Sequence, residues 1–225
     1  MISSTQLQAV FFDFDGVIAD SLAVKKNAFV TLFAPWGKAV QTAAVRYHEA
    51  NGGMPRHSKL RHCMEVLAGQ KISEAELAAL VRRFAELVFD AVVAAPLLPR
   101  VEQTLQALLQ AQIPAFVVSG TPEEEMQRIV RHKKLEPYFQ AVFGAPRQKS
   151  VIVQKVLSRY TFSPQYCLFI GDALADFKAA RTCGLAFLGI VPQGEPNIFP
   201  ADVAISPDPG HQHWPRLLGQ SFALP

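Results

Sequence analysis

Four aspartates follow two apolar runs that predict buried strands, and they are the residues best suited to chemistry. Asp13 and Asp15 end the run FFDFDGV, and Asp172 and Asp176 follow the run LFIG. Two carboxylates two positions apart in an extended segment project to the same side, where they repel each other unless a cation lies between them. A site rich in carboxylate oxygens that also keeps waters and a phosphate suits Mg²⁺. We therefore expect an Mg²⁺ site in which Asp13, Asp15 and Asp172 are ligands. Asp176, one helical turn beyond Asp172, is expected to be a further ligand or its support.

The same residues suit phosphoryl transfer. A carboxylate beside Mg²⁺ is a competent nucleophile toward phosphorus, and a second carboxylate can give a proton to the leaving alcohol and later take one from water. The transferred phosphoryl group also needs hydrogen-bond donors or cations that bind its oxygens. Ser119 with the loop amides of Gly120 and Thr121, and Lys149 with its point charge, are expected to supply them. The pattern indicates phosphate-ester chemistry.

These residues also have a purely structural interpretation. Ser119 fits the N-cap of a helix that opens at Pro122, and Lys149 fits a solvated lysine at a helix start. Asp172 and Asp176 fit a cap and a first-turn acid that the helix dipole favours. The set as a whole, placed at successive predicted strand ends, favours the chemical interpretation over the structural one.

The elements that must position these residues alternate between short apolar strands and helices. Strands are predicted at residues 7–14, 113–118, 141–143, 166–170, 186–191 and 202–205, and helices at residues 101–111, 122–133, 150–160 and 174–183. Such alternation predicts a parallel sheet with helices on both faces, and ligands collect outside the carboxyl ends of its strands. The predicted fold class is therefore α/β, a doubly wound, Rossmann-like parallel sheet. Segments 192–200 and 207–215 are rich in turn residues and predict irregular loops.

Residues 20–95 contain helical patterns and no convincing strand. Helices are predicted at residues 21–33, 39–50 and 73–93, and Ser73 with Glu76 forms a capping box for the last of these. We expect a helical cap inserted after the first strand. Residues 1–19 and 96–225 would then form the core domain, and residues 20–95 the cap domain. The links at 16–21 and 94–99 are expected to act as hinges that close the cap over the site and exclude water.

The composition of the chain disfavours several classes of function. The 225 residues include 22 Lys and Arg against 19 Asp and Glu, a net charge of +3, and the basic residues form no long run. This disfavours nucleic-acid binding but suits small anionic substrates. Cys63, Cys167 and Cys183 match no zinc or redox spacing and predict reduced core thiols. The start of the chain lacks the pattern of a signal peptide, and no run reaches the ~20 apolar residues of a membrane span. We therefore expect a cytoplasmic monomer or homodimer whose partner is a small phosphorylated metabolite, with no nucleic acid and no membrane.

The ordered segments FFDFDGVIADS, VVSGTP, RQKS and IGDALAD resemble the four motifs of the haloacid dehalogenase superfamily of phosphohydrolases. The resemblance covers essentially the whole chain, including the helical cap. It implies that Asp13 is the nucleophile that becomes aspartyl-phosphate. It implies that Asp15 is the general acid and base, with a backbone carbonyl that faces Mg²⁺. The remaining implied roles are phosphate ligands for Ser119 and Lys149, a metal ligand for Asp172, and a support of that ligand for Asp176.

Two positions depart from the usual motifs. Ala173 stands where Ser is common, and Ser150 follows the lysine where Pro is common. Neither change removes a catalytic atom. The presence of Asp15 argues against the dehalogenases and phosphonatases of the superfamily, which lack an acid at that position. The resemblance therefore implies chemistry on a phosphate ester.

The segment NGGMPRHSKL, residues 51–60, is similar to the specificity loop of phosphoglycolate phosphatase-like and β-phosphoglucomutase-like members. In this loop Arg56 is the candidate to bind an anionic end of the substrate through its guanidinium fork. A solvated loop arginine is the alternative interpretation. His57 and Lys59 are weaker candidates for the same contact.

The leading hypothesis is an Mg²⁺-dependent phosphatase of a small phosphate monoester. A phosphomutase of a sugar phosphate, which passes the phosphoryl group to a second hydroxyl, is the alternative within the enzyme class. A phospho-accepting signalling receiver and a non-catalytic binding protein are the alternatives from other classes. Receivers spread their acids over different strands and lack a helical insertion. A dinucleotide enzyme is disfavoured, because no G-x-G-x-x-G follows a predicted strand.

Overall fold

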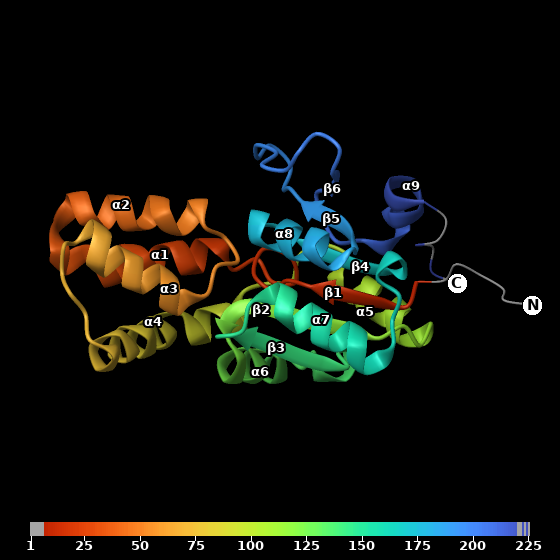
Figure 1. Cartoon of the computed structure of the whole chain (residues 1–225), viewed down its shortest axis with the longest axis horizontal. Helices are drawn as coiled ribbons and strands as arrows, with labels where there is room; N and C mark the ends of the chain where they lie inside the picture. The colour runs from red at the N-terminus through yellow and green to blue at the C-terminus, as the bar shows by residue number, and fades with distance from the viewer. Residues whose placement is uncertain (1–6, 220–221, 223, 225) are drawn as a thin grey trace, which may run out of the picture.

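A computed structural model describes residues 7–219, 222 and 224, and its centre is a six-stranded sheet (Figure 1). The strands are β1 (Ala9–Phe12), β2 (Ala115–Pro122), β3 (Ala141–Ala145), β4 (Cys167–Gly171), β5 (Ala186–Ile190) and β6 (Ala204–Ser206). Their order is β3-β2-β1-β4-β5-β6, and every neighbouring pair is parallel. The predicted doubly wound α/β fold is therefore confirmed, with β1 in the middle of the sheet.

Helices cover both faces of the sheet. They are α5 (Val101–Gln110), α6 (Glu123–His132), α7 (Lys149–Tyr160), α8 (Leu174–Cys183) and α9 (Trp214–Leu218). The residues of β1 alternate between the two faces. Val10 and Phe12 join the core that contains residues of α5 and α6, whereas Ala9 and Phe11 join the core that contains residues of α7 and α8. Because all of β1 is buried, the loop that follows it starts from a rigid position.

A group of helices between β1 and α5 lies to one side of the sheet, and we call it the cap (Figure 1). It comprises α1 (Leu22–Phe33), α2 (Gly37–Ala50), α3 (Arg56–His62) and α4 (Glu74–Ala94). The predicted capping box is confirmed, since Glu76 N donates to Ser73 Oγ at 3.3 Å and Ser73 N donates to Glu76 Oε2 at 2.8 Å. The exact domain boundaries stay a prediction.

Two segments that we predicted as loops are in fact helical. Helix α3 occupies part of the predicted specificity loop and continues as a π-helix over Cys63–Leu67. Its buried residues are Arg56, Lys59 and Leu60, so the apolar periodicity that reveals a helix is missing. Near the carboxyl terminus α9 begins at Trp214, inside the segment predicted to be irregular. Pro215 is compatible with the first turn of a helix, so its presence did not exclude one.

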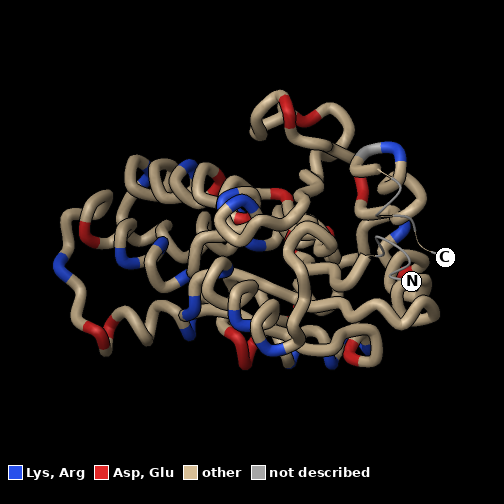
Figure 2. Tube along the Cα trace, turned by 45° about the vertical axis from the view of Figure 1, so that its right-hand side comes forward, with Lys and Arg blue, Asp and Glu red and all other residues tan. Residues whose placement is uncertain are grey.

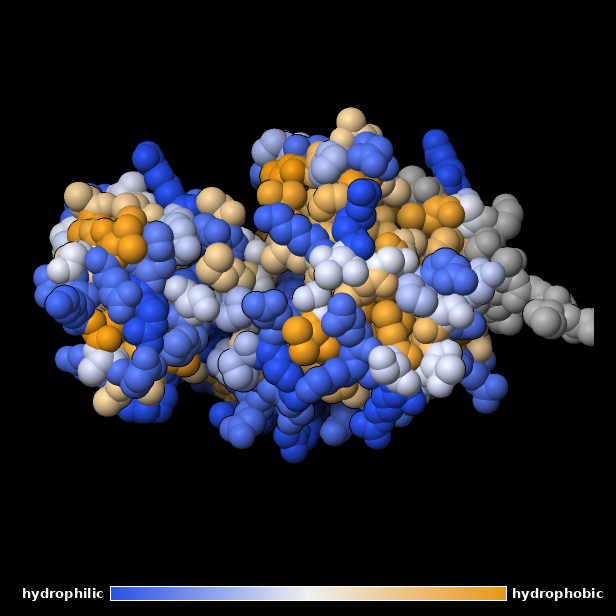
Figure 3. All heavy atoms as spheres, viewed as in Figure 1, coloured by the Kyte–Doolittle hydropathy of each residue, from blue (hydrophilic) through white to orange (hydrophobic). Residues whose placement is uncertain are grey.

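The distribution of charged residues and the state of the cysteines match what the composition predicts. Basic and acidic residues are intermixed along both the cap and the core (Figure 2). Apolar side chains on the face shown in Figure 3 form separate groups among hydrophilic ones. Cys63, Cys167 and Cys183 are buried and free of disulfides, as expected. Within the described residues, no helix combines the length and apolar character that crossing a membrane requires.

Candidate active site

The candidate residues meet at the carboxyl end of the sheet. Asp13 follows β1, Asp172 follows β4, and Lys149 opens α7. Because β1 lies between β2 and β4, the loops after these three strands converge. Asp13 N donates to Ile170 O at 2.9 Å, so strand pairing extends to the first residue of the loop. The backbone of Asp13 is thereby fixed at the edge of the sheet.

Lys149 ties two of the aspartates together. Its Nζ lies 2.9 Å from Asp13 Oδ1 and 2.6 Å from Asp176 Oδ1. Phe14 N also donates to Asp13 Oδ1, at 2.7 Å. Burial by itself would lower the pKa of Lys149, but the Asp13 and Asp176 carboxylates outweigh it and raise this pKa above its ordinary value. Lys149 is therefore a permanent cation beside Asp13.

Three carboxylates form a candidate metal centre. Asp13, Asp172 and Asp176 each offer an oxygen, and these oxygens lie within 4.8 Å of one another. Burial, and then the charges of Asp13 and Asp176, raise the pKa of Asp172 well above its ordinary value. The single positive charge of Lys149 does not balance the charges of three carboxylates, so this group favours the binding of a further cation. Gly16, with φ of +78°, lets the backbone approach, because a Cβ there would meet Asp172 Oδ2 at 2.4 Å. This donor set fits a hard divalent cation such as Mg²⁺.

The carboxylate of Asp15 lies outside that group. Ser21 Oγ donates to Asp15 Oδ1 at 2.6 Å, and Lys25 Nζ donates to Asp15 Oδ2. Burial would raise the pKa of Asp15, but the Lys25 ammonium and the Ser21 hydroxyl outweigh it and hold this pKa below its usual value. Of the four predicted metal ligands, Asp15 is the one whose carboxylate is not part of the group of three acids, and the backbone-carbonyl contact that the family resemblance implies for it stays a prediction.

Lys25 is a site residue that the sequence analysis did not predict. It lies on α1 in the cap, and its Nζ contacts Asp15 and also donates to Thr121 Oγ1 at 2.8 Å. The sequence feature that could have identified Lys25 is its position one helical turn after Ser21, which places both residues on one helix face. The sequence does not show that this face is turned toward Asp15.

Ser119 and the residues after it, at the carboxyl end of β2, lie beside these acids. Ser119 is buried in β2, and its Oγ accepts a hydrogen bond from Thr121 N at 3.1 Å. Gly120 and Thr121 line the same cavity as Asp13 and Asp15. The structure thus brings together the residues of all four motif segments. Their individual roles stay predictions.

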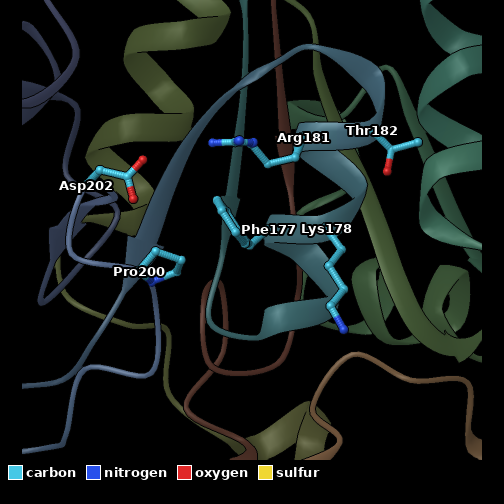
Figure 4. Close-up of a pocket in the computed structure, with 6 residues that line it drawn as sticks. All are labelled: Phe177, Lys178, Arg181, Thr182, Pro200 and Asp202. Carbon is cyan, nitrogen blue, oxygen red and sulfur yellow. The ribbon is translucent and has the colours of Figure 1, made fainter.

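A cavity of about 790 Å³ lies between the cap and this edge of the sheet. Its walls include Asp13, Asp15 and Asp172 from the core. A second pocket, of about 420 Å³, lies beside α8 (Figure 4). It is lined by Phe177, Lys178, Arg181, Thr182, Pro200 and Asp202. None of the motif aspartates lines this second pocket, so the larger cavity is the candidate substrate site.

The turn between α2 and α3 closes over the cavity. A Cβ at Gly120 would meet Gly53 O at 2.8 Å and Met54 O at 3.1 Å. A Cβ at Gly53 would lie 3.5 Å from Lys149 Nζ. The backbone of the cap therefore touches the core beside Lys149, and glycines occupy this contact because side chains have no room there. The structure shows the cap closed.

Gly120→Ala is expected to lower kcat/KM by about 10- to 100-fold while the fold stays intact. The added methyl group would occupy the space that Gly53 O requires, so the cap could not close fully. The backbone amide of Gly120 is retained. Steady-state kinetics beside thermal unfolding measure both effects. Wild-type kinetics in a folded variant would contradict the closed arrangement.

Arg56 is paired with the core in this structure. Its Nη1 and Nη2 lie 2.6 Å and 2.7 Å from the two carboxylate oxygens of Glu125 on α6. Its guanidinium also lies 4.5 Å from the centroid of the Phe84 ring. Both partners of this bidentate ion pair are buried, and they join the cap to the core. Arg56 lines the cavity, and its predicted contact with the substrate stays a prediction.

Glu125→Gln is expected to lower the free energy of unfolding by about 1–3 kcal/mol, because the buried Arg56 guanidinium loses its charged partner. Closure of the cap should also weaken, so KM should rise. Chemical denaturation and steady-state kinetics test this. The matched control is Glu124→Gln, an exposed neighbour on the same helix. Equal stability of the two variants would contradict a role for the Arg56–Glu125 pair in joining cap and core.

Comparisons with known proteins identify a family and relatives of this chain. A family model described as haloacid dehalogenase-like hydrolase matches residues 10–190. Phosphoglycolate phosphatase 1 of Pseudomonas aeruginosa is 26% identical over 182 residues, which are 78% of this chain and 66% of that protein. Phosphoglycolate phosphatase of Pasteurella multocida is 23% identical over 194 residues, 83% of this chain and 86% of that one. The crystal structure of CbbY from Rhodobacter sphaeroides in complex with phosphate shares the fold, with a TM-score of 0.72, 17% identity, and coverage of 91% of this chain and 96% of that one.

Proposed function

The chain belongs to the haloacid dehalogenase-like hydrolase family and is a phosphatase of that family, and we propose that it hydrolyses a small phosphate monoester with Mg²⁺ through an aspartyl-phosphate on Asp13. The observation that carries the proposal is the arrangement of Asp13, Lys149, Asp172 and Asp176 at the carboxyl end of the sheet, beneath the closed cap.

Asp13 has the position that a nucleophile needs. It lines the cavity, and its Oδ1 accepts from Phe14 N and is paired with Lys149 Nζ. Among the described residues, no donor binds its second oxygen, Oδ2. One side of the carboxylate is thus held in place while the other can attack phosphorus. The new bond joins Asp13 to phosphorus as the bond to the leaving alcohol breaks.

Asp15 is the residue that would move the protons in this proposal. It is two residues from Asp13, lines the same cavity, and is oriented by Ser21 and Lys25. In its protonated form it gives a proton to the leaving alcohol, and as a carboxylate it takes one from the water that attacks the phosphorylated Asp13. The low pKa of Asp15 in this closed form favours the carboxylate, which is the form required in the second step.

The other residues bind the transferred group and the ion. Asp13, Asp172, Asp176 and the Asp15 carbonyl are the groups that would hold Mg²⁺. When bound, the ion neutralises the carboxylates and the charge on the phosphoryl oxygens. Lys149, and Ser119 with the backbone amides after it, are the groups that would bind those oxygens. The cavity of about 790 Å³ suits a small phosphorylated metabolite.

Phosphate release from a panel of small phosphate esters, with Mg²⁺ and with a chelator, tests the proposal. Mg²⁺-dependent release is the expected result, and release that the chelator leaves unchanged would contradict the proposed metal dependence. The phosphomutase alternative is tested in the same panel by phosphorus NMR of a hexose monophosphate. A rearranged hexose phosphate without inorganic phosphate would favour the mutase over the phosphatase.

A further inference from the structure

Four cationic side chains at the cavity are buried or half-buried, and three of them are paired with carboxylates; two further lysines of the cavity wall, Lys26 and Lys178, are exposed. Lys25 pairs with Asp15, Arg56 pairs with Glu125, and Lys149 pairs with Asp13 and Asp176. The fourth is Lys59 on α3, which lines the cavity from the cap. In the described part of the chain, no carboxylate lies close enough to Lys59 to form an ion pair. Among the described residues, Lys59 is therefore the one buried cation of the cavity wall without an anionic partner, since Lys178, which also has no ion pair, is exposed to solvent.

Lys59 is held in place rather than free to swing into solvent. Its side chain is only 5% exposed, and its Nζ lies 3.3 Å from His48 Nδ1. Burial, and then the charge of Lys59, lower the pKa of His48 to about 3, so the ring is neutral and its Nδ1 accepts from the ammonium. The His48 ring in turn stacks on Phe29, with centroids 4.2 Å apart. Phe29 and His48 thus orient the ammonium at the cavity wall.

A buried ammonium without a counter-ion is costly. Burial, and then the charges of Lys25 and Lys149, lower the pKa of Lys59 to about 8. The group is still mostly protonated at neutral pH, so the closed cavity keeps the unpaired charge. An anion bound beside it would remove this cost. The phosphoryl group to be transferred already has Lys149 and the metal centre in the core, whereas Lys59 belongs to the cap, which faces the leaving group.

We propose that Lys59 binds a second anionic group on the leaving-group side of the substrate, so that the preferred substrate is a phosphate ester whose alcohol part itself carries a carboxylate or a phosphate. This inference rests on the proposed phosphatase function and deepens it by naming the substrate class. The shared chemistry is a compact oxyanion that accepts charge-assisted hydrogen bonds from an ammonium. The two sources, carboxylate and phosphate, are separated by the choice of substrates.

The test compares pairs of substrates that differ in the second anion. Phosphoglycolate is compared with 2-hydroxyethyl phosphate, and a hexose bisphosphate with the hexose monophosphate. The proteins are wild type, Lys59→Met and the control Lys71→Met, an exposed lysine of the cap. Methionine keeps most of the buried stem and removes only the charge. We expect Lys59→Met to lower kcat/KM for the anionic member of the preferred pair by about 10- to 100-fold, and to change kcat/KM for the neutral member by less than about threefold.

Each outcome decides the proposal. A loss confined to phosphoglycolate assigns the carboxylate, and a loss confined to the bisphosphate assigns the phosphate. Equal losses for both members of each pair, or no loss, would overturn the inference while leaving the phosphatase intact. Thermal unfolding should show Lys59→Met to be at least as stable as wild type, because an unpaired buried charge has been removed.

A binding measurement separates failure of this inference from failure of the proposed function. If no substrate is hydrolysed, the phosphatase proposal fails, and the role of Lys59 is then decided by calorimetry of phosphoglycolate and of the bisphosphate on the Asp13→Asn protein. Affinity at least about tenfold lower in Asp13→Asn with Lys59→Met would support the contact. Equal affinities for both anions would overturn it.

Discussion

Asp13→Asn is expected to reduce phosphate release by at least about 10³-fold and to leave the fold unchanged. The amide keeps the size of the side chain and can still accept from Phe14 N, but its nitrogen cannot attack phosphorus as the carboxylate oxygen does. The variant also removes one of the three acids of the metal centre. Initial rates on the best substrate of the panel, at saturating Mg²⁺, measure the loss.

The matched control for this variant is Asp90→Asn, an exposed aspartate on α4 of the cap. It makes the same chemical change far from the motif residues and should keep wild-type rates. Circular dichroism and thermal unfolding establish that both variants are folded. Substantial turnover by the Asp13→Asn protein would mean that another group attacks phosphorus.

Lys149→Met is expected to be the most destabilising of the variants considered, with a loss of about 3–5 kcal/mol in the free energy of unfolding. Lys149 Nζ is the only cation among the described residues that pairs with Asp13 and Asp176, and Asp176 is fully buried. Removing it leaves their charges uncompensated. The same variant should lose at least about 100-fold in kcat/KM, because a phosphoryl ligand is lost.

Added Mg²⁺ should recover part of the stability of Lys149→Met, since a divalent cation would again balance the carboxylates. Denaturant unfolding at several Mg²⁺ concentrations measures this recovery. Lys155→Met, an exposed lysine on the same helix α7, is the control and should unfold like wild type. A Lys149→Met protein as stable as that control would contradict the buried ion-pair network.

The core of the fold was predictable because its local patterns agree with its tertiary structure. Helix α8 was predicted with the bounds that the structure shows, and the strands after it were placed within a few residues. The apolar run before Asp13 predicts a strand buried on both faces, and β1 is that strand. Once the sheet is parallel, the residues that follow β1, β2 and β4 must meet at one edge. The convergence of Asp13 and Asp172 follows from this, and Ser119 lies near them in the last part of β2.

The contacts between cap and core were not predictable in the same way. Helix α3 buries charged residues, so its pattern resembles that of a polar loop. The partner of Arg56 is Glu125, 69 positions away, and the partner of Asp15 is Lys25, on a different element. No periodicity within one segment encodes such pairs. They depend on how the closed cap sits against the sheet, which only the folded structure reveals.

The most direct test of the central claim is to trap the covalent intermediate on Asp13. The enzyme is mixed with its best substrate and Mg²⁺, quenched in acid during turnover, and reduced with borohydride, which converts an aspartyl-phosphate to homoserine. Peptide mass spectrometry then locates the modified residue. We predict homoserine at position 13 in the wild type and none in Asp13→Asn. Steady phosphate release with no modification at position 13, or with modification at another aspartate, would contradict the proposed mechanism.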